Sequence, residues 1–192
     1  MGRTPNFKID NDVYGKFGEN VFEQWSNNKG FKTLNVTSDK EFQDQDIDFI
    51  SIVNKEYDKE RLLLEDKLSF YSEERAKNTA FTTEVKTDTR TFSTRNVVYE
   101  LLSHDNPGCL ARSKADFIFY VAVDEDATVT KEAWFINLSK WRKWLREHSR
   151  DVNHHDSPIK LNNYNTHGDA CMNFLCNIDQ MVKDGIATKA EI

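Results

Sequence analysis

Few cysteines and no long apolar segment occur in this sequence. The three cysteines, Cys109, Cys171 and Cys176, are odd in number and form no closely spaced pair motif, which argues against a disulfide framework. No segment approaches the roughly 18 apolar residues of a membrane helix, and the first residues lack the apolar stretch of a secretory signal. We therefore expect a cytoplasmic protein with reduced thiols and no membrane partner.

Internal repeats, low-complexity tracts and linker-like stretches are also missing from the 192 residues. Hydrophobic residues make up 38% of the chain and charged residues 30%, which is enough apolar material for a sizeable core beneath a water-soluble surface. We expect residues 1–192 to form a single domain.

The sequence also lacks the basic excess that is usual in proteins that bind nucleic-acid phosphates, because its net charge is -6. Positive residues are nevertheless clustered. A local DNA-binding groove could be formed by Arg90, Arg95, Arg112 and Lys114, and a second basic cluster lies within residues 140–150. The acidic excess includes carboxylates that a metal site would need, so it weakens a nucleic-acid function without excluding it.

Alternating helix and strand patterns predict an α/β fold. Apolar residues at helical spacing predict a helix over residues 14–25, and strands follow over 31–37 and 46–53. Residues 55–78 are highly charged but keep apolar residues on one helical face, which predicts a helical insertion. We interpret it as a surface helix over a sheet edge, with a substrate clamp or dimer contact as the alternative.

The second half of the chain continues the α/β pattern. Further strands are predicted over residues 80–88, 97–103, 133–138 and 171–178. The long apolar run within 113–124 is typical of a strand buried on both faces, as at the centre of a sheet. Ser139 is a candidate N-cap for a helix with Trp141 and Trp144 on its apolar side. The polar segment 151–169 predicts a loop.

The strand over residues 80–88 carries the strongest candidate for chemistry. Because side chains alternate along a strand, Glu84 and Lys86 share one face while Val85 points to the other. Asp48, on the preceding predicted strand, comes beside Glu84 if the two strands pair. Two carboxylates of this kind suit Mg²⁺ or Mn²⁺, which accept one or two carboxylates together with water and phosphate.

Such a metal would acidify a bound water and polarise a phosphoryl oxygen, which phosphodiester hydrolysis requires. Lys86 would orient the water or stabilise the developing negative charge. A role for Lys86 as general base would require its pKa to be lowered by burial or by a nearby cation. We prefer the electrostatic role.

The order of these elements resembles the PD-(D/E)XK nuclease superfamily, to which many restriction endonucleases and Holliday junction resolvases belong, and in particular its small phage and prophage members. The resemblance covers roughly residues 13–123, and it is carried in chain order by Gly15, Gly18, Glu19, Asp48, Glu84-Val85-Lys86 and Glu100. It implies a restriction-endonuclease-like mixed central β-sheet flanked by helices.

The resemblance also implies roles for individual residues. Asp48 would be the metal-binding aspartate, Glu84 the second metal ligand and Lys86 the catalytic lysine. Glu19 would add to the metal site directly or through water, and Glu100 would be the later acidic position. This sequence departs from the pattern in two ways. No proline precedes Asp48, and Asp46 competes with it because the run is Asp46-Ile47-Asp48, in which strand alternation puts both aspartates on one face. In addition, 36 positions separate Asp48 from Glu84 (84 − 48 = 36).

Weaker candidates have simpler interpretations. Asp88 either shares the face of Lys86 or starts a turn, and Asp116 either caps a turn or lies at the edge of the site. Core packing is the simpler role for three tryptophans, Trp134, Trp141 and Trp144. Four histidines have no compact zinc-binding spacing, and a solvated loop is their simpler setting. They are His148, His154, His155 and His167.

The leading hypothesis is a Mg²⁺- or Mn²⁺-dependent endonuclease acting on DNA. A homodimer would suit double-strand cleavage, which needs two centres, whereas a monomeric nickase fits the sequence equally. One alternative is an inactive nuclease-like fold that binds nucleic acid or protein. Another is a phage-encoded protein that binds a host factor through its acidic surface.

Overall fold

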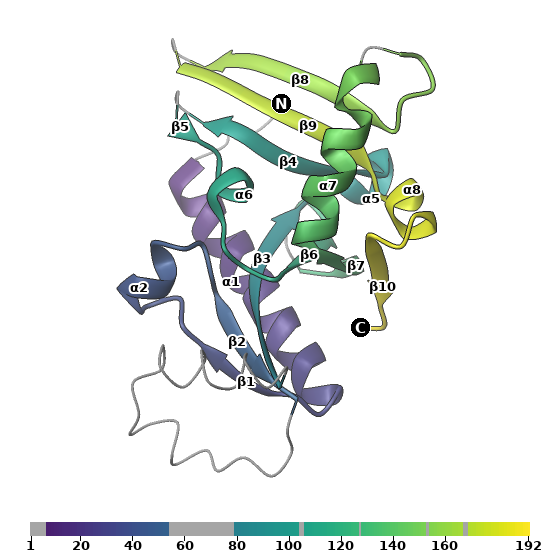
Figure 1. Ribbon diagram of the computed structural model, residues 1–192. Helices are drawn as coiled ribbons and strands as arrows, with labels where there is room; N and C mark the ends of the chain where they lie inside the picture. Colours follow the sequence, from purple (N-terminus) through teal and green to yellow (C-terminus); the bar gives the residue numbers. More distant parts are fainter. Residues whose placement is uncertain (1–6, 54–78, 104–105, 127, 153, 167–168) are drawn as a thin grey trace.

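The computed structural model describes residues 7–53, 79–103, 106–126, 128–152, 154–166 and 169–192 (Figure 1). The helical insertion predicted for residues 55–78 lies outside these described residues. Within them, no helix is long and apolar enough to cross a membrane.

A six-stranded mixed sheet forms the centre of the fold, in the order β1-β2-β3-β6-β7-β10. β3 and β6 are parallel, and the other neighbours are antiparallel. The strands are β1 (Lys32–Asn35), β2 (Phe49–Ile52), β3 (Ala80–Asp88), β6 (Phe117–Val123), β7 (Thr130–Asn137) and β10 (Ala187–Ala190). The apolar run that predicts a central strand is β6, and its placement inside the sheet is confirmed.

A second, antiparallel sheet has the order β5-β4-β9-β8. Its strands are β4 (Asn96–Ser103), β5 (Asn106–Pro107), β8 (Ile159–Thr166) and β9 (Asp169–Asn177). The prediction of a loop over residues 151–169 is therefore wrong, because β8 pairs with β9 from Ile159 to Thr166. As an edge strand, β8 needs apolar residues at few positions, and Ile159 is buried whereas Asn162 is exposed.

Helices cover both faces of the central sheet. α1 (Phe7–Asn28) packs on one face, where the Phe22 ring lies 4.8 Å from Phe49 and 5.1 Å from Phe119 between centroids. On the other face, α7 (Leu138–His148) buries Trp141 and Trp144 in a cluster with β6 and β7. The core role of the tryptophans is confirmed. The shorter helices are α2 (Lys40–Gln43), α5 (Thr91–Thr94), α6 (Cys109–Arg112), η1 (Ser149–Asp151) and α8 (Ile178–Lys183).

The N-cap of α7 differs from the prediction. Asn137 occupies the cap, and its side chain accepts the backbone N–H of Lys140 at 2.9 Å. Ser139 lies inside the first turn, and its hydroxyl donates to Asn137 Oδ1 at 3.0 Å. The helix therefore begins two residues earlier than expected, at Leu138, whose side chain is fully buried.

Close packing of α1 on β3 decides which face of β3 is left for chemistry. A Cβ added at Gly18 would lie 2.1 Å from Thr87 Oγ1 and 3.1 Å from Val85 Cγ1. Helix α1 therefore rests directly on the face of β3 that carries Val85 and Thr87. By strand alternation, Glu84 and Lys86 point to the opposite face.

Candidate active site

The pairing of β2 with β3 brings Asp48 to Glu84. Phe49 is the register partner of Thr83, so Asp48, one residue earlier, stands opposite Glu84. The backbone N–H of Asp48 donates to the Thr83 carbonyl at 3.0 Å, and the Val85 N–H donates to Asp48 Oδ2 at 2.7 Å. The carboxylate of Asp48 is thus fixed beside β3 although it lies just outside β2.

Glu84 and Lys86 form an ion pair, with 2.6 Å between Lys86 Nζ and Glu84 Oε1. The Glu84 side chain is only 3% exposed, and its second oxygen, Oε2, has no hydrogen-bond partner among the described residues. Burial raises the pKa of Glu84, and the negative charge of Asp48 raises it further. The charge of Lys86 and the Ser113 hydroxyl lower it, but the pKa stays above its ordinary value. A buried carboxylate oxygen without a partner is costly, so a further group bound at Oε2 would stabilise Glu84.

Lys86 is held in its charged form. Burial lowers the pKa of Lys86, but the negative charges of Glu84 and Asp48 outweigh burial and leave the pKa above its ordinary value. A general base would need the opposite shift. The arrangement instead supplies a fixed positive charge beside two carboxylates.

Glu19 joins this cluster from α1. Burial raises the pKa of Asp48, while the Val85 N–H and Lys86 lower it and the charge of Glu19 raises it. The pKa of Glu19 is raised by burial and lowered by a hydrogen bond with Asn35 and by Lys16. Asp48 therefore links the other two acidic groups, because the charge of Glu19 acts on Asp48 and the charge of Asp48 acts on Glu84.

Asp46 and Asp48 are two positions apart, but their carboxylates have different partners, Arg112 for Asp46 and the Val85 N–H for Asp48. Asp46 adopts the left-handed conformation, with φ of 50°, outside β2. Its carboxylate receives two bonds from Arg112, at 2.7 and 2.9 Å. The expectation that both aspartates lie on one face of a strand is wrong, because the turn containing Asp46 precedes the strand. Of the two, Asp48 is the residue beside Glu84.

The four predicted DNA-binding cations are dispersed. Arg112 pairs with Asp46, and Arg95 bonds to Asp179 and Glu132 while its guanidinium lies 5.5 Å from the Trp134 ring centroid. The remaining two lie at opposite ends of β3, Arg90 just after the strand and Lys114 in a cavity around its first residues. Two of the four are thus paired with carboxylates of this chain.

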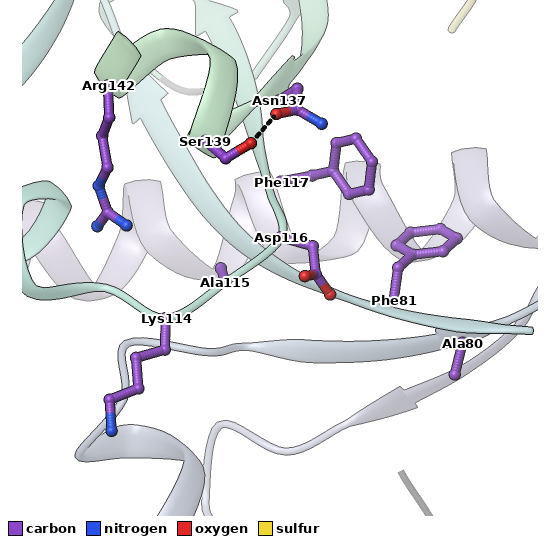
Figure 2. A pocket seen from close by; sticks show the side chains of 9 residues that line it. All are labelled: Ala80, Phe81, Lys114, Ala115, Asp116, Phe117, Asn137, Ser139 and Arg142. Atoms are coloured by element: carbon purple, nitrogen blue, oxygen red, sulfur yellow. Dashed lines mark hydrogen bonds between the residues drawn. The ribbon is translucent and has the colours of Figure 1, made fainter. Parts of the chain in front are cut away.

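That cavity has a volume of about 620 Å³ and lies between the start of β3 and the start of α7 (Figure 2). Asp116, at its centre, accepts the Thr82 N–H at 2.9 Å and the Thr82 hydroxyl at 3.1 Å. Arg142 donates to the Leu110 and Ser113 carbonyls. The charged groups here hold chain segments together, and Glu84 lies three residues beyond Phe81, the last β3 residue that lines the cavity.

Glu100 and Cys109 lie near Glu84 and Lys86, which both influence the Cys109 thiol. Glu100 Oε2 accepts the Cys109 N–H at 2.9 Å. Burial, together with Glu84 and Glu100, raises the pKa of the Cys109 thiol to about 12, although Lys86 lowers it. Cys109 is therefore a neutral thiol near Lys86. No sequence pattern distinguishes it, because a lone cysteine after a Pro-Gly turn carries no spacing information.

The weaker metal candidates are not assembled. Asp88 accepts the backbone N–H groups of Arg90 and Thr91 and the Tyr120 hydroxyl, so its carboxylate starts the turn after β3. Across the residues that the structure describes, no group of three or more His, Cys, Asp and Glu side chains is arranged as a metal site. His167 is not among those residues. A carboxylate pair with water and phosphate remains the composition that suits Mg²⁺.

Comparisons with protein-family models, curated proteins and solved structures found no match.

The raised pKa values predict a pH dependence of metal binding. A cation held by Asp48 and Glu84 would bind their ionised forms, so protons would compete with it until the pH exceeds their raised pKa values. We expect Mn²⁺ to bind about tenfold tighter at about pH 8 than at about pH 5, measured by calorimetric titration. In Asp48→Asn the dependence should become weaker. An affinity that does not change with pH would contradict the assignment.

Proposed function

We propose that this chain is a metal-dependent endonuclease that hydrolyses phosphodiester bonds in DNA. The observation that carries the proposal is the buried Glu84 carboxylate, which has one oxygen on Lys86 and the other without a described partner, opposite Asp48. The order of Glu19, Asp48, Glu84 and Lys86 in the sequence supports the same function.

The residues present fit a divalent cation of the Mg²⁺ or Mn²⁺ type. Asp48 and Glu84 offer hard oxygen ligands, and Glu19 adds negative charge from α1. When bound, the cation would acidify a water and polarise a phosphoryl oxygen. Lys86 would stabilise the negative charge that develops on the phosphate during attack, because its ammonium is fixed and stays protonated.

The test is cleavage of plasmid, branched and single-stranded DNA with Mg²⁺ or Mn²⁺ and with a chelator. Asp48→Asn should lower the rate by about 100-fold or more, since asparagine can still accept the Val85 N–H but lacks the ligand charge. Asp46→Asn is the matched control, because Asp46 pairs with Arg112, and it should change the rate by less than about 10-fold. No cleavage of any substrate, or full activity of Asp48→Asn, would reject the proposal.

A second candidate is a nuclease-like fold that binds nucleic acid or protein without catalysis. The Glu84–Lys86 ion pair favours it, because the ammonium already neutralises the buried carboxylate. The net charge of -6 favours it as well. Metal titration separates the two candidates, since a non-catalytic protein would show no divalent-metal binding that Asp48→Asn abolishes.

A further inference from the structure

A second cavity lies where the end of β3 meets the four-stranded sheet. It has a volume of about 560 Å³ and begins at Asp88, two positions after Lys86 on the same face of β3. Its lining includes Arg90, Asn96, Val98, Asn162, Asn173 and Leu175. Its wall therefore continues directly from the candidate active site.

Strand pairing gives this sheet two different faces. Val97 and Tyr99 on β4 are buried with α7, as is Cys176 on β9. Between them, Val98 stands opposite Leu175 and points to the cavity. The cavity face gathers three amide side chains and two apolar ones, from three neighbouring strands.

β4 is attached to the central sheet at the active-site end. The Val98 N–H donates to the Tyr120 hydroxyl at 3.2 Å, and that hydroxyl donates to Asp88 at 3.1 Å. Glu100, two residues further along β4, accepts the Cys109 N–H. The cavity face is thus held in a fixed position relative to Lys86.

The chemistry of the lining suits a nucleobase. Amides offer donors and acceptors to the polar edge of a base, and Val98 and Leu175 offer apolar contact to its ring. The exposed Arg90 at the rim is placed for a phosphate. On α5, which contributes Thr94 to the lining, the Phe92 side chain is 49% exposed and can stack on a neighbouring base.

We propose that this cavity binds an unpaired nucleobase of the strand that is cut at Asp48, Glu84 and Lys86. The proposal rests on the proposed nuclease function for the identity of that strand. A base inside a duplex must leave the stack to enter a lateral cavity, and this cost is least for a nucleotide that is already unpaired, so the preferred substrate carries an unpaired nucleotide next to the scissile bond. The preferred substrates are single strands or duplexes with a bulge or a gap.

Binding is measured by fluorescence anisotropy with labelled single-stranded, fully paired and singly bulged DNA in Ca²⁺, without cleavage. Wild-type protein should bind the bulged and single-stranded forms about tenfold tighter than the paired duplex. Asn162→Ala and Phe92→Ala should reduce this preference by about fivefold or more. The matched controls are Leu161→Ala, on the other face of β8, and Val129→Ala, another exposed apolar residue, and neither should change it.

Equal affinity for the three DNA forms, or an unchanged preference in both Asn162→Ala and Phe92→Ala, would overturn the cavity assignment. Failure of the nuclease proposal gives a different result. In that case wild-type protein still prefers unpaired DNA and the two variants still lose this preference, but no DNA is cut in Mg²⁺ or Mn²⁺. Thermal melting of each variant checks that the fold is retained.

Discussion

Replacing Lys86 with methionine should reduce DNA cleavage by about 100-fold or more, which is the usual effect of removing a fixed charge that stabilises a transition state. The same change should destabilise the fold in the absence of metal. Removal of one partner of a buried ion pair costs about 3–5 kcal/mol. We expect a smaller cost, because the Lys86 side chain is 33% exposed and water reaches the pair.

The pH dependence of this destabilisation follows from Glu84. Burial already raises the pKa of Glu84, and loss of Lys86 removes the charge that lowers it. A group whose pKa is raised by folding stabilises the fold below its unfolded pKa, and this contribution is lost as pH rises through the folded pKa. Lys86→Met should therefore melt closest to wild type near about pH 5 and deviate most near about pH 8.

Added Mn²⁺ should restore more stability to Lys86→Met than to wild type, because the cation replaces the missing positive charge beside Glu84. Thermal melts with Mn²⁺ and with a chelator measure the difference. Lys189→Met is the control, since Lys189 pairs with Glu132 near the surface, and its stability and its response to Mn²⁺ should match those of wild type. Equal stabilisation of all three proteins by Mn²⁺ would show that the cation does not bind at Glu84.

The part of this site that lies on β3 follows from local sequence. The alternation and β-branched residues of Ala80–Asp88 predict the strand and the shared face of Glu84 and Lys86. The position of Asp48 needs one further step, the pairing of consecutive strands. The turn that separates Asp46 from Asp48 could not be inferred. The left-handed conformation of Asp46 and its ion pair with Arg112 depend on residues far along the chain.

The four-stranded sheet could not be derived from local pattern. Its central pairing joins Asn96 to Asn177 and therefore depends on long-range register. β8 is polar because one of its sides is exposed, so its composition resembles that of a loop. Charge alone also fails to show whether an arginine meets phosphate or a neighbouring carboxylate, as Arg95 and Arg112 illustrate.

Gly18→Ala should destabilise the fold although alanine is the better helix former. The added methyl group would meet Thr87 Oγ1 at 2.1 Å, so α1 or β3 must shift. Overpacking of this kind costs about 1–3 kcal/mol, which exceeds the gain of about 1 kcal/mol in helix propensity. Gly15→Ala is the matched control on the same helix. No described atom lies within 4 Å of its added Cβ, and the variant should be neutral or stabilised.

The Gly18 change should also weaken metal binding. It would displace α1, and α1 carries Glu19, whose charge acts on Asp48. Urea denaturation measures the stability of both variants, and Mn²⁺ titration measures the affinity. Gly18→Ala should bind Mn²⁺ several-fold more weakly and Gly15→Ala should bind it as wild type does. If Gly18→Ala unfolds at the wild-type urea concentration, the close contact of α1 with β3 is wrong. If only its metal affinity is unchanged, Glu19 does not contribute to the metal site.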